Sequence, residues 1–116
     1  MKTASAKAKG RRAAAEVREM LLAAAPELQA DDIQVKATSV PGEDLWLSPA
    51  ARAVYPFAFE VKCVEALNVW AALSQAETHA EGTNYSPLVA FRRNRTELHV
   101  ALKFSDFLGL ISGRRK

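Results

Sequence analysis

The start of the chain carries apolar residues at helical spacing. Val17, Met20 and Leu21 recur within a stretch rich in alanine, arginine and glutamate, which is the pattern of a helix with one apolar stripe. Pro26 ends this pattern, because the residue before a proline is sterically pushed away from helical backbone angles. The sequence therefore predicts a helix over residues 5–25.

Runs of β-branched and aromatic residues follow, and such runs predict strands. The strongest covers residues 57–64, where the apolar character is almost continuous, as in a central strand that is covered on both faces. Weaker runs predict further strands over residues 33–37, 45–47, 88–91 and 98–102. Residues 48–52, which lie between two of these strands, are expected to form a loop or a single helical turn.

Two further helices complete the predicted order. Asn68 can cap a helix over residues 68–81. Ser105 can cap a short last helix that reaches Leu110. A helix that connects the third and fourth strands implies a crossover between them, whereas a tight turn between the fourth and fifth strands implies a hairpin. We therefore expect an α/β fold in the order α-β-β-β-α-β-β-α, with a mixed central sheet and helices on its faces.

Composition narrows the class of protein. The chain has 116 residues, of which 49% are hydrophobic and 25% are charged, the usual make-up of one globular domain. No apolar run approaches the ~20 residues that cross a bilayer, and no signal-like segment opens the sequence. The single cysteine excludes an intramolecular disulfide and a multi-cysteine zinc site. We expect a cytoplasmic protein without a membrane partner.

Charge is distributed unevenly along the chain. Residues 1–12 hold five basic residues and no acid, residues 113–116 hold three basic residues, and residues 13–112 hold 8 basic and 13 acidic residues. This pattern predicts a basic N-terminal arm, an acidic central domain and a basic tail, over those same ranges. Such a chain is suited to hold a cation centrally and to touch a polyanion at its edges. The alternative is that charged ends only keep a small protein in solution.

Two acids and a lysine stand where a metal site would need them. Asp44 precedes the strand over residues 45–47, and Glu60 and Lys62 lie two positions apart on the strongest strand, so their side chains share a face. If the second and third strands are antiparallel neighbours, Asp44 and Glu60 can approach one ion. Carboxylate oxygens suit Mg²⁺ or Mn²⁺. The alternative is an exposed salt bridge between Glu60 and Lys62.

This constellation resembles the PD-(D/E)xK nuclease superfamily. Pro41-Gly42-Glu43-Asp44 is similar to its first half-motif, although the proline does not directly precede Asp44, and Glu60-Val61-Lys62 is similar to its second. The resemblance covers nearly the whole chain, and the predicted element order agrees with it. It implies a restriction-endonuclease-like core and metal-dependent hydrolysis of phosphodiester bonds.

Within the superfamily, the chain most resembles Holliday junction resolvases of the archaeal type and related phage endonucleases. Lys9-Gly10 followed by Glu16, Ser39 before the aspartate, and Gln75 on the helix after the lysine stand in the order found there. The distance from Gly10 to Glu16 is longer than in those proteins, which leaves Glu19 as a second candidate for the same role. The resemblance implies a phage or prophage source and, for a phage protein, a location in the host cytoplasm.

The resemblance also implies roles for individual residues. Asp44 and Glu60, helped by the carbonyl of Val61, would hold Mg²⁺, for which Mn²⁺ would substitute. Lys62 would orient or help deprotonate the attacking water. Gln75 would orient the water or Lys62, and Glu16 would bind a second metal. The alternatives are that Glu16 and Gln75 are exposed helical residues.

DNA contacts are expected from two basic regions. A turn that exposes several arginines can bind phosphates. The N-terminal arm would add affinity for DNA without recognition of bases. The residues expected to contact DNA are Lys7, Lys9, Arg11, Arg12, Ser39, Arg92, Arg93 and Arg95. The alternative for Ser39 is that it is an ordinary turn residue. His79 is expected to stabilise the C-terminus of its helix or to contact DNA. The alternative is a catalytic role, since His79 follows Gln75 by one helical turn and the two can share a face.

The resemblance favours cleavage of branched DNA, with Holliday junctions first. Symmetric cutting of two strands by a chain with one active site implies a two-fold homodimer. Trp46, Trp70, Tyr55 and Phe57 are candidates for its apolar interface or for the core. The alternatives are the same chemistry on flap, nicked or plain duplex DNA, and a nucleic-acid-binding subunit that does not cut.

Overall fold

A computed structural model describes residues 2–36 and 42–114 of the chain. The helices are α1 (Lys2–Ala24), the 3-10 turn η1 (Ala30–Asp32), α2 (Pro49–Val54), α3 (Val69–Ala80) and α4 (Phe104–Arg114). The strands are β1 (Ile33–Val35), β2 (Leu45–Leu47), β3 (Phe57–Cys63), β4 (Ser86–Arg92) and β5 (His99–Ala101). No helix formed by the described residues is long and apolar enough to cross a membrane.

The structure confirms an α/β fold with a mixed sheet. In the sheet β3-β4-β5, β3 and β4 run parallel and are connected through α3, whereas β4 and β5 are antiparallel. The predicted order of strands and helices is reproduced, with α2 as an additional helix where a loop or one helical turn was expected. Ser48 explains this helix, because its side chain caps the N-terminus at the amide of Ala51 and proline follows it directly.

The first two strands do not join the central sheet. β1 and β2 form an antiparallel pair of their own, with Ile33 opposite Leu47. The condition that β2 and β3 are antiparallel neighbours is therefore not fulfilled. Asp44, just before β2, still reaches β3, because its amide donates to the carbonyl of Phe59 at 2.9 Å. β2 is short, and its buried Leu45 and Leu47 pack into the core between the β1–β2 pair and β3.

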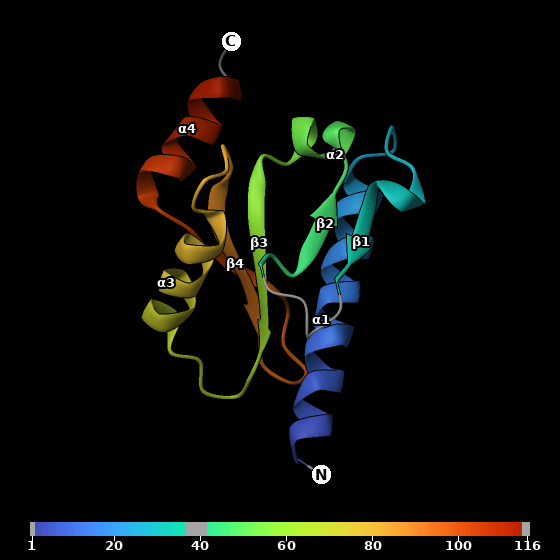
Figure 1. The fold of residues 1–116 in the computed structure, drawn as a ribbon, viewed down its shortest axis with the longest axis vertical. Helices are drawn as coiled ribbons and strands as arrows, with labels where there is room; N and C mark the ends of the chain where they lie inside the picture. Colours follow the sequence, from blue (N-terminus) through green and yellow to red (C-terminus); the bar gives the residue numbers. More distant parts are fainter. Residues whose placement is uncertain (1, 37–41, 115–116) are drawn as a thin grey trace.

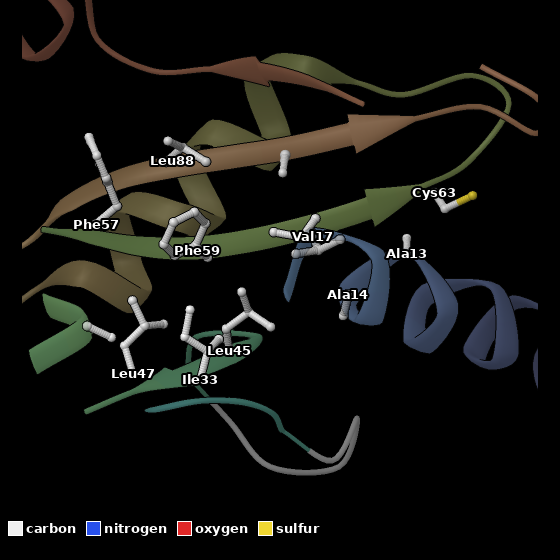
Figure 2. Close-up of a cluster of buried hydrophobic side chains, with 13 residues drawn as sticks. Ala13, Ala14, Val17, Ile33, Leu45, Leu47, Phe57, Phe59, Cys63 and Leu88 are labelled. Carbon is white, nitrogen blue, oxygen red and sulfur yellow. The ribbon is translucent and has the colours of Figure 1, made fainter. Parts of the chain in front are cut away.

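Helices cover both faces of β3 and β4. Figure 1 shows α1 on one side of these strands and α3 on the other. The larger core lies on the α1 side, where Val17, Ile33, Leu45 and Phe59 converge (Figure 2). A smaller core on the α3 side contains Ala72, Ala76 and Val89. Residues 2–12 of the predicted arm form the first half of the continuous helix α1, so the expected division after residue 12 falls inside a helix.

Alternation along β3 places Glu60 in a buried position. Phe57, Phe59, Val61 and Cys63 belong to the core on the α1 side. Because successive side chains of a strand point to opposite faces, Glu60 is directed to the α3 side. The prediction of a strand covered on both faces is confirmed, and a carboxylate therefore stands in its middle.

Candidate metal-binding site

A cavity of about 290 Å³ lies along the edge of β3 that is not paired with β4. α1 forms one wall of this cavity and α3 contributes to another. Its polar lining residues are Lys7, Arg11, Lys36, Asp44, Glu60, Lys62 and Gln75. Val61 and Cys63 complete the β3 wall. The cavity thus combines two carboxylates with four basic side chains.

Asp44 is fixed to β3 on both sides of Glu60. Its amide donates to the carbonyl of Phe59 at 2.9 Å, and its Oδ2 accepts a hydrogen bond from the amide of Val61 at 2.7 Å. On its other side, its carbonyl accepts from the amide of Lys36 at 3.1 Å. These bonds hold the Asp44 carboxylate beside Glu60, although β2 itself does not pair with β3.

Glu60 is a buried acid with cationic or polar partners. Only 2% of the residue is exposed. Nδ1 of His79 lies 2.8 Å from Oε1, and Nζ of Lys62 lies 3.6 Å from Oε2. Burial raises the pKa of Glu60, and the neighbouring Asp44 raises it further, while His79 and Lys62 act in the opposite direction. Ionisation of Glu60 beside Asp44 is therefore unfavourable unless a cation is bound close to both carboxylates.

The oxygen atoms at this site suit a divalent cation. Asp44 and Glu60 provide carboxylates, and Val61 lines the same cavity. The described residues form no group of three or more His, Cys, Asp and Glu side chains placed to hold an ion. This partial set matches Mg²⁺ better than zinc, because Mg²⁺ keeps several waters and uses one or two carboxylates together with substrate phosphates.

Two basic residues of α1 share this cavity. Lys7 and Arg11 lie one helical turn apart and line it together with Gly10 and Ala14 of the same helix. The other expected DNA contacts in this helix, Lys9 and Arg12, are not among its lining residues.

The expected helix carboxylates lie elsewhere. Oε1 of Glu16 accepts from Nε of Arg92 at 2.8 Å, and Glu19 pairs with Arg18 at 2.6 Å. Neither acid is among the described residues that line the cavity. Helical geometry explains this, because residue 16 projects from the side of α1 opposite to residues 7, 10 and 14. Arg92, for which DNA contact was expected, forms an ion pair with Glu16 instead.

The arginines of the β4–β5 turn are exposed and do not line the cavity. The side chain of Thr96 accepts from the amide of Arg93 at 2.9 Å, and Arg95 has a left-handed backbone with φ of 64°. Arg93 and Arg95 therefore belong to an ordered turn, and neither lines the cavity of Asp44 and Glu60. Ser39 and Pro41 lie outside the described residues.

His79 and Lys36 are functional candidates to which the sequence interpretation gave no place in the site. The spacing of four residues from Gln75 suggested a catalytic role for His79 on one face of α3, but a position at the helix end or on DNA was preferred. In the structure its ring contacts the buried carboxylate of Glu60. Lys36 directly follows β1, and no local pattern marked its proximity to Asp44.

Arg52 of α2 braces the segment that carries Asp44. Its guanidinium donates to both carboxylate oxygens of Glu43, at 2.7 and 2.8 Å, and also to the carbonyl of Phe57. It lies over the ring of Tyr85 at 4.2 Å from the centroid. This largely buried pair fixes the residue before Asp44 to the start of β3. The sequence interpretation assigned no role to Glu43 or Arg52 beyond the motif letters.

No protein-family model, curated protein or solved structure matches this chain.

Proposed function

We propose that this protein is a metal-dependent endonuclease that hydrolyses phosphodiester bonds in DNA. The observation that carries the proposal is the buried carboxylate of Glu60, which shares one cavity with Asp44 and Lys62. A buried, ionised acid is unfavourable unless it is paired or coordinated. His79 and Lys62 offset this penalty only in part, because burial and the neighbouring Asp44 still leave the pKa of Glu60 raised. A divalent cation would offset the remainder.

The donor atoms define how an ion would be held. Asp44 and Glu60 would bind Mg²⁺, or Mn²⁺ in its place, with the carbonyl of Val61 as a further oxygen ligand. When bound, the ion would act as a Lewis acid toward the phosphate and would lower the pKa of water. His79 would keep the Glu60 carboxylate oriented through its contact at 2.8 Å.

Lys62 would act on the water and the phosphate. Its side chain lines the cavity, and its Nζ is 3.6 Å from Glu60. An ammonium at this position can hold the attacking water in line and offset charge that develops on the phosphate. Gln75, which lines the same cavity, can donate and accept hydrogen bonds to the same water or to Lys62.

The basic lining residues support a polyanionic substrate. Lys7, Arg11 and Lys36 surround the acids without forming an ion pair with another described residue. Such groups bind phosphates regardless of base sequence. The preference for branched DNA, with four-way junctions as the first substrate, follows from the resemblance to junction resolvases in the PD-(D/E)xK superfamily.

Cleavage of a labelled panel tests the proposal. A four-way junction, a flap, a nicked duplex, a plain duplex and a single strand are incubated with Mg²⁺, Mn²⁺ or EDTA. We expect paired symmetric nicks on the junction with either metal and none with EDTA. Asp44→Asn, Glu60→Gln and Lys62→Met should each lower the rate by about 10²–10⁴-fold. Glu97→Gln, which removes an exposed acid outside the cavity, should retain it.

The other outcomes separate the competing functions. Cleavage of every substrate, with the same dependence on metal and on the three residues, would support the nuclease activity and contradict the preference for junctions. Salt-sensitive DNA binding without cleavage in the presence of either metal would overturn the proposed nuclease activity and favour a binding subunit that does not cut. Cleavage that survives all three site variants would show that the assigned cavity is not the active site.

A further inference from the structure

A second cavity adjoins the cavity of Asp44 and Glu60, at the C-terminal ends of β3 and β4. Its volume is about 360 Å³, within the roughly 300–1,000 Å³ of small-ligand sites. Val64, which directly follows β3, lines both cavities. Phe91 of β4 lines the second cavity and stands beside Lys62 of β3 in the parallel register. Because paired strands are only about 4.8 Å apart, a group in the second cavity is a near neighbour of a phosphate at Lys62.

One part of the second cavity is aliphatic and aromatic. Leu67 lies between β3 and α3, Val69 is the first residue of α3, and both line the cavity with Phe91 and His99. The rings of Phe91 and His99 are cross-strand neighbours on β4 and β5, with centroids 6.0 Å apart and planes at 31°. Phe91 is half-buried and His99 is exposed. The second cavity therefore offers aromatic surface to a flat ligand.

The charge on the lining of the second cavity is positive. Arg92 and Arg93 line it, and none of its lining residues in the described part of the chain is an acid. Arg92 is paired with Glu16 at 2.8 Å, whereas Arg93 forms no ion pair with another described residue. The guanidinium of Arg93 is therefore available to an anion.

Hydrogen bonds hold the walls of the second cavity in place. Oε2 of Glu65, which follows Val64, accepts from the amide of Asn94 at 2.9 Å and ties the segment after β3 to the β4–β5 turn. Nδ1 of His99 donates to the carbonyl of Glu97 at 3.0 Å, and this bond fixes the imidazole ring. A site that is formed before its ligand arrives loses little conformational entropy on binding.

These properties match an unpaired nucleotide. A nucleobase presents flat faces that stack on aromatic side chains, and the phosphate attached to it is an anion. In a duplex the faces of each base are covered by neighbouring base pairs, so only a base that has left the stack can enter such a cavity. An apolar peptide could use the aliphatic wall, but it would leave Arg93 without a partner.

We propose that the second cavity binds the base of an unpaired nucleotide next to the phosphate that is cleaved. Phe91 and His99 stack on the base, and Arg93 pairs with a phosphate of the same strand. Stacking accepts any base, so the second cavity selects DNA with an unpaired position over plain duplex without reading its sequence. The place beside the cleaved phosphate rests on the proposed function, whereas binding of the base does not require cleavage.

Two matched probes test the second cavity without cleavage. One is a labelled duplex with a single unpaired adenine, and the other carries an abasic nucleotide at the same position, so the two differ only in the base. In EDTA, the wild-type protein should bind the adenine probe about 10-fold more tightly by fluorescence anisotropy. Phe91→Leu and His99→Ala should each bring the two affinities together. Phe107→Leu makes the same aromatic change on α4, outside the second cavity, and should keep the preference.

Arg93→Gln tests the phosphate contact separately. It should weaken the binding of both probes equally, because both carry the same phosphates. Arg95→Gln is its matched control, since Arg95 is an exposed arginine of the same turn that does not line the second cavity. Far-ultraviolet circular dichroism verifies that each variant is folded.

The outcomes separate this proposal from the nuclease. Equal affinity of the wild-type protein for the two probes, or no binding of either, would overturn the base site. So would a base preference that Phe91→Leu and His99→Ala leave unchanged, or that Phe107→Leu abolishes equally. A preference for the unpaired adenine without cleavage in Mg²⁺ would support the base site and overturn the nuclease. Cleavage in Mg²⁺ should fall at a phosphate that adjoins the unpaired base, and cleavage elsewhere would overturn the place of the second cavity beside the cut.

Discussion

The carboxylate of Glu60 is subject to opposing influences. Burial and the neighbouring Asp44 raise its pKa, whereas the hydrogen bond from His79 and the charge of Lys62 counteract them. Because the net shift is upward, the folded protein holds this proton more tightly than the unfolded chain does. The free energy of unfolding therefore falls as the pH rises through the ordinary glutamate range and up to the raised pKa.

Replacing this acid should stabilise the metal-free protein. Glu60→Gln removes the charge and keeps the shape, so at neutral pH it should raise the free energy of unfolding and the Tm. The gain should disappear in acid, where wild-type Glu60 is itself protonated. Thermal unfolding monitored by circular dichroism across pH measures this. A lower Tm for Glu60→Gln at neutral pH would mean that the Glu60 pairs are net stabilising.

His79 should matter for metal binding through Glu60. His79→Ala removes the donor that favours the ionised carboxylate, so Mn²⁺ affinity should fall by about 10–100-fold, as for other partners of metal ligands. His79→Gln, which retains an N–H donor, should recover part of this loss. His99→Ala, which changes an exposed histidine outside the cavity, serves as the control. Equal affinities for His79→Ala and His99→Ala would assign His79 no role at the site.

Elements with a strong local signal could be predicted from the sequence. The continuous apolar run of β3 and the capped apolar stripe of α3 are properties of a few adjacent residues, and both elements form within one or two residues of the expected bounds. α2 was harder, because six residues carry little periodicity and its role depends on Glu43 and Phe57 from other elements. The separation of β2 from β3 was likewise set by packing.

The brace between α2 and the Asp44 segment should contribute to stability. The side chains of Arg52 and Glu43 are only 11% and 16% exposed, so Arg52→Met leaves a nearly buried carboxylate without its partner. We expect a loss of about 2–4 kcal/mol in the free energy of unfolding, measured by urea denaturation. The double variant with Glu43→Gln should lose less than the sum of the single changes. Additive losses would contradict a direct coupling.

At the scale of the whole molecule, the site depends on contacts that no local pattern contains. Asp44, Glu60 and Lys62 could be grouped from the sequence because their types and spacing resemble a known motif. The ion pair between Glu16 and Arg92 joins residues 76 positions apart, and it removes Glu16 from the expected metal site. The His79 contact likewise depends on how α3 packs against β3, and the place of Lys36 depends on how β1 pairs with β2 and packs on α1.

The distribution of basic residues on α1 predicts how DNA binding responds to salt. Lys7 and Arg11 line the cavity, whereas Lys9 and Arg12 do not. Replacing Lys7 and Arg11 by alanine should weaken binding uniformly across sequences and reduce the slope of log affinity against log salt by about 2. The pair Lys9→Ala and Arg12→Ala removes the same charge from the same helix and should change the slope less. Fluorescence anisotropy measures both, and identical effects would argue against a cavity-centred DNA path.

Binding of Mn²⁺ by the intact protein tests the central claim most directly, because it requires neither a substrate nor a choice of DNA structure. Isothermal titration calorimetry should show saturable binding to the wild-type chain, and both Asp44→Asn and Glu60→Gln should weaken it by about 10-fold or more. Glu97→Gln should bind like the wild type. Absence of binding by the wild-type protein, or equal binding by all four proteins, would contradict a metal site between Asp44 and Glu60.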